Sequence, residues 1–416
     1  MSRLVTFGAL IAPLGVGCGP TEDPVPAAEA PAAAEIPPWP ERDFVRVATF
    51  NIQELSRDKL FATDDAGVGA HPQVRAAATV IQRVRPDVLV LNEVDHYYGQ
   101  GVRGISAYAH RFVELYLNTG EAPINYPYVL VAPNNTGMLS GLDLNRDGTV
   151  ATEVDEGTRG FGDDSFGFGT YQGQYSMVVL SRFPMDAARS RTFRSFLWKD
   201  LPGHHMPEAF YGAEVAEILR LSSKSHWDFP LVIGEQALHL WVSHPTPPVF
   251  DGDEDRNGRR NFDEIRFWSL YLDGSDAIYD DQGRRGGFDG SAPFIIAGDL
   301  NAQPGATESL YDGGNAISQL LDDARIQDPG DMVSSLGALQ GRAAGAPAHH
   351  ERSTAGFLGG VRVDYVLPSA ALTVDGGGVF WPDEADDPDG SAVAAAASDH
   401  HLVWIDVRLP PPDGGD

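Results

Sequence analysis

Residues 294–301 read FIIAGDLN, an apolar run that ends in a glycine, an aspartate and an asparagine. The same order, an apolar run followed by a residue able to bind a metal or a phosphate, recurs along the chain. The further runs are 45–50 before Asn51, 88–91 before Asn92 and Glu93, 241–243 before His244, and, in reverse order, Asp399 and His400 before 402–407. Buried strands that converge on one edge of a sheet gather distant residues into one rigid site. Carboxylate, amide and imidazole groups of this kind suit a divalent cation and phosphate-ester hydrolysis.

The order of strand-like and helix-like segments predicts an α/β fold. Residues 44–50 and 87–92 have the pattern of strands on either side of a helix at about 72–84. Further strands are expected at 176–180, 229–233, 237–243, 294–297, 361–367 and 402–407, and a further helix at 264–272. We therefore predict a four-layer α/β sandwich, in which two mostly antiparallel sheets pack face to face and helices cover their outer faces.

The N-terminal segment has the pattern of an export signal. Residues 1–3 form a short basic segment, and residues 4–17 form an apolar stretch too short to span a bilayer. The single cysteine, Cys18, follows in a context that resembles a bacterial lipoprotein cleavage box; an ordinary signal peptide containing a cysteine is the alternative. We predict a signal peptide at 1–17, a lipidated disordered tether at 18–41, one folded domain at 42–409 and a disordered tail at 410–416. The protein would be periplasmic or on the cell surface, and would meet the membrane only through its lipid anchor.

The charge balance bears on the substrate. The chain has 59 acidic and 30 basic residues, a formal net charge of -29. Duplex DNA would meet broad repulsion unless a local basic patch overrode it, which argues against an avid, non-specific nuclease. Surface acidity that serves solubility is the alternative interpretation.

Seven short motifs follow one another along the chain: ATFN at 48–51, PDV at 86–88 leading to Glu93, LSRFP at 180–184, SH at 243–244, GDLN at 298–301, VDYV at 363–366 and SDH at 398–400. In this order they resemble the motifs of the endonuclease/exonuclease/phosphatase superfamily, which includes deoxyribonuclease I. Each motif alone is weak, but seven in the family's order are specific. The resemblance covers about residues 42–408.

The resemblance implies a role for each polar residue. Glu93 would bind Mg2+ (or Mn2+), and Asp399 would be a second metal ligand or the partner of a histidine. Asp299 would be the general base that takes a proton from the attacking water. Asn301 would position that water, and Asn51 would orient phosphate oxygens.

Two imidazoles and one more carboxylate complete the implied site. His400 would contact the phosphate, and His244 would stabilise or protonate the leaving oxygen. Asp364 would orient His244 through a hydrogen bond to its other ring nitrogen.

Other polar residues give less specific signals. Arg259 and Arg260 follow His244 and suit a second phosphate group of the substrate, or equally ion pairs within their own acidic loop. Two runs have the spacing of oxygen ligands in calcium-binding loops: Asp143, Asn145 and Asp147, and Asp253, Asp255, Asn257 and Glu264. Structural Ca2+ at one of these loops and acidic turns without metal are the two interpretations.

Together these observations predict an exported, monomeric, metal-dependent phosphoesterase that hydrolyses small phosphomonoesters. An extracellular endonuclease or exonuclease acting on nucleic acid is the first alternative, and it requires a basic groove. A non-catalytic surface binding module on the same scaffold is the alternative from another class. That module would have a broken catalytic set, whereas every expected position is filled except Gln53, where some relatives have a metal-binding carboxylate.

Overall fold

The computed structural model describes residues 36–99, 103–290, 292–330, 333, 335–340 and 350–411. The predicted signal peptide, most of the predicted tether and residues 412–416 of the predicted tail lie outside these ranges. Among the helices within the described ranges, none has the length and apolar character needed to cross a membrane.

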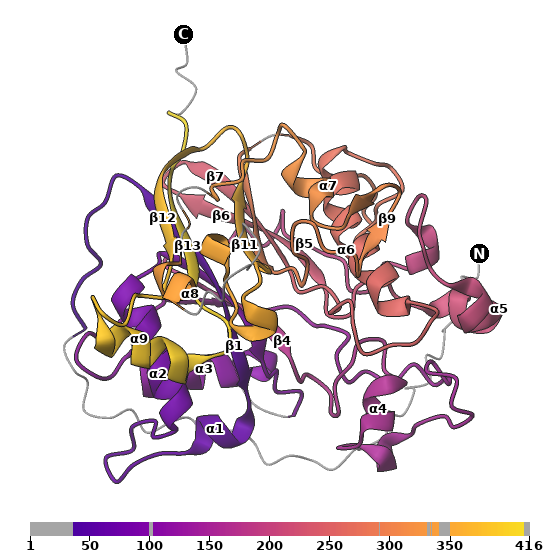
Figure 1. Cartoon of the computed structure of the whole chain (residues 1–416), viewed down its shortest axis with the longest axis horizontal. Helices are drawn as coiled ribbons and strands as arrows, with labels where there is room; N and C mark the ends of the chain where they lie inside the picture. The colour runs from indigo at the N-terminus through magenta and orange to yellow at the C-terminus, as the bar shows by residue number, and fades with distance from the viewer. Residues whose placement is uncertain are drawn as a thin grey trace, which may run out of the picture.

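Two mostly antiparallel sheets lie at the centre of the molecule (Figure 1). The first has the order β12-β13-β1-β2-β4-β3 and the second the order β11-β8-β7-β6-β5. Their strands are β1 (Val45–Leu55), β2 (Val88–Val94), β3 (Tyr128–Leu130), β4 (Ser176–Ser181), β5 (Arg191–Thr192), β6 (His226–Ile233), β7 (Gln236–Ser243), β8 (Phe294–Asp299), β11 (Asp364–Pro368), β12 (Thr373–Val379) and β13 (Val403–Arg408). One pair in each sheet is parallel, β1 with β2 and β7 with β8. Strands β9 (Leu310–Tyr311) and β10 (Gly314–Asn315) form a separate hairpin.

Helices flank the sheets on both outer sides. They are α1 (Arg57–Phe61), α2 (Pro72–Val84), α3 (Ala107–Phe112), α4 (Arg159–Asp163), α5 (Glu208–Ile218), α6 (Arg256–Leu272), α7 (Ser318–Leu321), α8 (Leu336–Gln340) and α9 (Pro388–Ala397). In Figure 1, α2, α3 and α9 lie on the side of the first sheet, and α6 and α7 on the side of the second.

Three apolar cores separate the four layers. The middle core joins the two sheets, with Val47 of the first sheet and Leu240 of the second among its members. A second core lies between the first sheet and α2, and a third between the second sheet and α6. Strand β1 contributes to two of them, because Val47 points to the middle core while Ala48 and Phe50 point to the helices. A strand covered on both faces is apolar along most of its length, and in the stretch 45–50 only Arg46 and Thr49 are polar. The predicted four-layer α/β sandwich is therefore confirmed.

Some elements differ from the sequence expectation. Helix α6 begins at Arg256 rather than near residue 264, so it absorbs half of the predicted second calcium loop. Strand β11 begins at Asp364 rather than at 361. Strand β12 was not predicted, because its sequence TVDGGGV is rich in glycine, which has a low intrinsic preference for strands. The alanine-rich helix α9 was not predicted either.

Candidate active site

The two sheets meet at one end of the sandwich through polar side chains. The backbone N–H of Asp299, at the end of β8, donates to Oδ1 of Asn92 on β2 at 3.1 Å. Asn51 of β1 donates from Nδ2 to Oδ2 of Asp299 and to Oε1 of Glu93, each at 3.0 Å. Asn51 and Asn92 are partners in the parallel β1–β2 pair, so the register of that pair sets them side by side. Asn92 was not among the predicted site residues, although it directly precedes Glu93 in the sequence.

Glu93 occupies a β-bulge. Strand β2 pairs with β4 through Asn92–Met177 and Val94–Ser176, which leaves Glu93 without a partner in the ladder. Its φ is +65°, in the left-handed region, which costs a residue other than glycine on the order of 1–3 kcal/mol. Bulges beside active sites redirect side chains, and here the carboxylate also accepts the backbone N–H of Glu54 at 3.1 Å.

Gly298 allows β7 and β8 to approach each other closely. Its φ is +153°, and a Cβ at this position would lie 2.1 Å from the carbonyl oxygen of Ser243. The GDLN motif therefore needs its glycine for packing, and the close approach sets His244 beside Asp299. His244 Nε2 lies 3.5 Å from Asp299 Oδ2. Asn301 donates from Nδ2 to the carbonyl of Pro245 at 3.1 Å, which ties the same two loops together.

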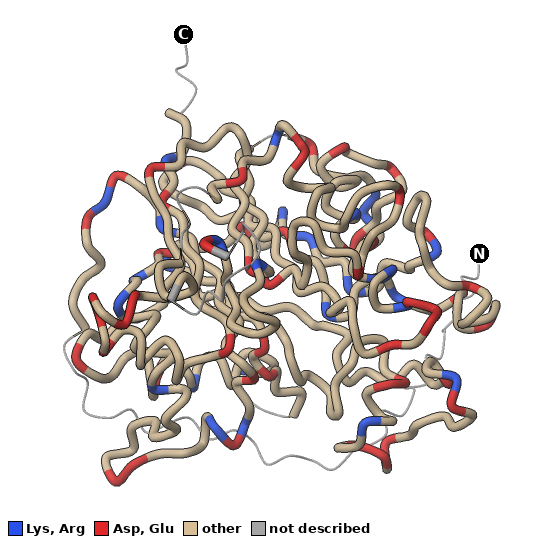
Figure 2. The backbone as a smooth tube through the Cα atoms, viewed as in Figure 1, with Lys and Arg blue, Asp and Glu red and all other residues tan. Residues whose placement is uncertain are grey.

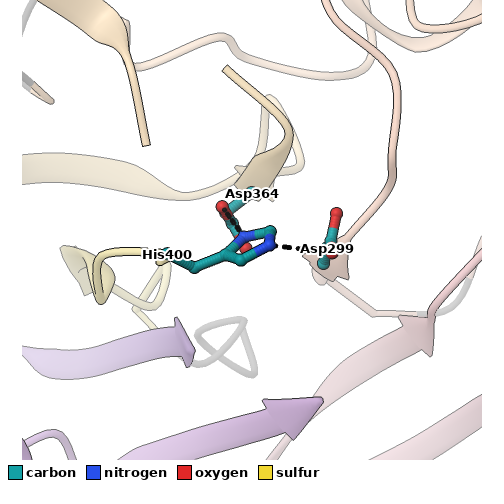
Figure 3. A group of neighbouring side chains, drawn as sticks. All are labelled: Asp299, Asp364 and His400. Atoms are coloured by element: carbon teal, nitrogen blue, oxygen red, sulfur yellow. Dashed lines mark hydrogen bonds and ion pairs between the residues drawn. The ribbon is translucent and has the colours of Figure 1, made fainter. Parts of the chain in front are cut away.

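Asp299, Asp364 and His400 form the centre of the site (Figure 3). Asp299 and Asp364 are partners in the antiparallel β8–β11 pair. His400 lies between the two carboxylates, with Nδ1 at 2.9 Å from Asp364 Oδ2 and Nε2 at 3.8 Å from Asp299 Oδ2. The expectation that Asp364 orients His244 is therefore wrong, because the β8–β11 register directs Asp364 to His400. Within the described residues, Nδ1 of His244 has no hydrogen-bond partner.

Thr354 holds Asp364 in place. Its hydroxyl donates to Asp364 Oδ2 at 2.8 Å and accepts the backbone N–H of Asp364 at 3.1 Å. On the other side of His400, Ser398 Oγ accepts the backbone N–H of His400 at 3.1 Å and donates to the carbonyl of Asn51 at 2.8 Å. Thr354 lies in a loop without a recognisable motif, so no sequence signal marked it.

The two imidazoles of the site have opposite electrostatic environments. Burial opposes the charged form of His400, but the carboxylates of Asp364 and Asp299 outweigh it and raise the pKa of His400 to about 10. Burial, assisted by the positive charges of Lys224 and His400, lowers the pKa of His244 well below its ordinary value. Burial also raises the pKa of Asp299 to about 7. The site thus offers an imidazolium, a neutral imidazole and a carboxylate with raised basicity.

The donor set fits a divalent cation. Asp299 and Asp364 offer carboxylate oxygens within 4.8 Å of each other, whereas His400, which its raised pKa keeps protonated, acts as a cation rather than as a ligand. Glu93 shares one amide donor with Asp299, and buried Oδ1 of Asp364 has no hydrogen-bond partner among the described residues. Asp399 is exposed in the loop before His400. Clustered carboxylate oxygens with unsatisfied acceptors are what hard divalent cations require.

The predicted arginines are engaged elsewhere. Arg260 is buried and donates to the carbonyls of Leu221, Phe166 and Arg220 at 2.6–2.9 Å, so the expectation that it binds phosphate is wrong. Arg259 lies over the Tyr311 ring at 5.1 Å and donates to the carbonyl of Glu254 at 3.0 Å.

The second predicted calcium loop does not assemble. Glu264 is buried in α6, where one carboxylate oxygen accepts from Ser223 and the other accepts the backbone N–H of Thr246 at 2.6 Å. It therefore cannot complete the loop. Asp255 precedes α6 and contacts the Tyr311 hydroxyl, and Asn257 donates to the carbonyl of Val249 at 2.6 Å.

In the first predicted calcium loop, the carboxylates and the amide oxygen accept hydrogen bonds from neighbouring backbone N–H groups. Asp143 accepts the N–H groups of Asp147 and Gly148 at 3.2 and 2.9 Å. Asn145 Oδ1 accepts from Asp147 N at 3.0 Å, and Asp147 Oδ1 accepts from Thr149 N at 2.8 Å. These contacts form turns that close without a ligand.

Comparisons with known proteins give one family match and several similar solved structures. A family model described as "Endonuclease/Exonuclease/phosphatase family" matches residues 48–400. A search of the curated proteins finds no match. Similar solved structures include an endonuclease/exonuclease/phosphatase from Beutenbergia cavernae, with 22% identity, TM-score 0.49, and 88% of this chain and 72% of that chain covered. A mannosyl-6-phosphatase from Bacteroides thetaiotaomicron has 11% identity, TM-score 0.42 and coverages of 87% and 99%. The human Nocturnin catalytic domain with bound sulfate has 15% identity, TM-score 0.43 and coverages of 89% and 96%.

Proposed function

We propose, from the premise that the chain belongs to the endonuclease/exonuclease/phosphatase family, that it is an exported magnesium-dependent phosphatase of small phosphomonoesters. The family hydrolyses phosphate esters, so the enzyme class is that of a phosphoesterase. The observation that carries the proposal is the buried group of Asp299, Asp364 and His400 beside Glu93 and Asn51, joined from both sheets.

Asp299 has the position and basicity of the general base. Its Oδ1 accepts the backbone N–H of Asn301 at 2.9 Å, and its Oδ2 faces both imidazoles of the site. A carboxylate with a raised pKa is half ionised near neutral pH and can take a proton from water.

The imidazoles would act on the phosphate. His400, kept charged by Asp364, would bind a nonbridging phosphate oxygen. His244 stays neutral because its pKa is lowered, so it suits donation of a hydrogen bond to the leaving oxygen better than full proton transfer. A divalent cation held by Glu93 would supply charge neutralisation to the phosphate.

The distribution of charge favours a small substrate. Figure 2 shows Lys and Arg scattered among Asp and Glu, without a continuous basic stripe in this view of the described residues. Several arginines are held in ion pairs away from the site, such as Arg46 with Asp406 at 2.7 Å and Arg362 with Asp328 at 2.6 Å. A small phosphomonoester needs no extended basic groove, whereas duplex DNA does.

The test is hydrolysis by the purified protein with Mg2+ or with EDTA. The substrates are p-nitrophenyl phosphate, bis-p-nitrophenyl phosphate and plasmid DNA, with Asp299→Ala as the control. We expect Mg2+-dependent cleavage of the monoester, absent in the variant. Nicking of plasmid DNA without monoester cleavage would favour the nuclease, and no turnover of any substrate would favour the binding module. Cell fractionation tests export, and the comparison with Cys18→Ser tests the lipid anchor; both rest on residues 1–18.

A further inference from the structure

Lys224 differs from the other two lysines of the chain, Lys59 and Lys199. Lys59 donates to the carbonyl of Gln53 at 2.8 Å, and Lys199 pairs with Glu217. Lys224 is buried, with 7% of its surface exposed. Within the described part of the chain, its ammonium makes no hydrogen bond and no ion pair within 4.0 Å. Burial of a lysine side chain without a partner for its ammonium costs free energy.

The backbone around Lys224 is fixed beside the catalytic histidine. Its carbonyl accepts the N–H of Asn135 at 2.9 Å. The preceding residue, Ser223, donates its N–H to Glu264 at 2.7 Å, and the same carboxylate accepts the N–H of Thr246, two residues after His244. Ser223 Oγ also reaches the carbonyl of His244 at 3.5 Å. Glu264, first predicted as a calcium ligand, therefore joins the Lys224 segment to the His244 segment.

The charges close enough to act on the Lys224 ammonium are the carboxylates of Glu264, Glu93 and Asp299 and the guanidinium of Arg260. Glu93 and Asp299 belong to the active site, and the ammonium in turn acts on His244. Glu264 is already hydrogen-bonded through both oxygens. The ammonium is thus held close to the reacting groups without being neutralised by any of them at contact distance.

We propose that Lys224 is a further catalytic residue, whose ammonium binds a nonbridging oxygen of the substrate phosphate beside His244. This inference rests on the proposed function and sharpens its substrate class. A phosphomonoester dianion carries one more negative charge than a diester, so an additional fixed cation favours the monoester. Lysine, a compact point charge, suits a contact with a single oxygen better than the planar fork of arginine does.

The variants that test this role are Lys224→Met, which keeps the apolar stem and removes the charge, and Lys199→Met as the matched control. Loss of a hydrogen bond to a charged group predicts a fall in kcat/KM for p-nitrophenyl phosphate of about 10- to 100-fold. Inhibition by inorganic phosphate should weaken by a similar factor, and bis-p-nitrophenyl phosphate should lose less. Lys199→Met should leave all three unchanged. A Lys224→Met enzyme within twofold of the wild type, or an equal loss for monoester and diester, would overturn the proposal.

A measurement on the unaltered protein covers the case in which Lys224→Met fails to fold. Because the chain has three lysines, acetylation with acetic anhydride can be followed at each by mass spectrometry. Inorganic phosphate should protect Lys224 and leave Lys59 and Lys199 unaffected. Equal labelling of Lys224 with and without phosphate would overturn the inference. This result does not depend on turnover, so failure of the proposed function and failure of the Lys224 site are separable.

Discussion

The active-site end of the sandwich and the acidic loop at 143–149 both collect carboxylates, but they satisfy them in opposite ways. In the loop, Asp143 and Asp147 accept hydrogen bonds from backbone N–H groups within five residues. In the active site, Glu93 and Asp299 come from different sheets and share one amide donor, Asn51. From the sequence alone, both clusters look like groups of oxygen ligands for a metal.

The difference lies in what each cluster lacks. Among the described residues, Oδ1 of Asp364 and Nδ1 of His244 are buried without a hydrogen-bond partner, and Lys224 is buried without an ion pair. Buried polar groups are usually satisfied. Other buried atoms of the described residues, such as the indole nitrogens of Trp227 and Trp241, also lack a partner, but those of the active site lie beside carboxylates from both sheets, where a bound ligand would complete them. In the loop, the carboxylates already accept hydrogen bonds from its own backbone N–H groups. Of these two clusters, only the active site combines unsatisfied buried groups with carboxylates from separate elements.

The largest expected effect tests how the site holds its charges. Asp364→Asn removes the carboxylate that raises the pKa of His400, and we expect kcat to fall about 100-fold or more. Activity that requires charged His400 is lost as the pH rises through its pKa, so the variant should lose activity at a lower pH than the wild type. Thr354→Val removes only one hydrogen bond to Asp364, and we expect about a tenfold loss. A pH–rate profile of both variants provides the measurement. An unchanged alkaline limb in Asp364→Asn would show that His400 does not act as an imidazolium.

The strands that carry the site and the family of the chain were predictable from the sequence. The apolar runs before Asn51, Glu93 and Asp299 predicted strands of both sheets. The seven motifs predicted the family, which the match over residues 48–400 confirms. A strand buried on both faces lacks the alternation of polar and apolar residues, so its run of apolar residues is easy to identify in the sequence.

The partners within the site were not predictable in the same way. Asp364 binds His400 rather than His244 because of the β8–β11 register, which depends on backbone pairing across a separation of 65 residues along the chain (299 to 364). Thr354 and Asn92 act through geometry that no local pattern encodes. Arg260 and Glu264 looked like ligands in sequence, but α6 turns both into the interior, where backbone groups hold them.

A second prediction contrasts two buried imidazoles. His400 lies between carboxylates, whereas His226 on β6 faces the carbonyl of Glu264 at 2.8 Å, and burial lowers the pKa of His226 to about 4. The unfolded chain binds a proton below its ordinary pKa of 6.5, and the folded protein does so only near 4. The free energy of unfolding therefore falls as the pH drops from 6.5 to 4, by up to about 3 kcal/mol for this group. His226→Gln should remove that part of the loss in urea unfolding at a series of pH values. The same acid-induced loss in variant and wild type would contradict the assignment.

The smallest expected effect concerns the loop and could reverse the comparison. Asp147→Ala removes the acceptor for the Thr149 N–H, and because the residue is exposed we expect stability to fall by less than about 1 kcal/mol with kcat unchanged. Calcium should not raise the Tm of either protein, since the loop's turns close without a ligand. If calcium stabilised the wild type but not Asp147→Ala, carboxylates that accept hydrogen bonds within local turns would also be metal ligands. Unsatisfied burial would then no longer separate the two clusters, and local spacing would regain its value as a guide to metal sites in this chain.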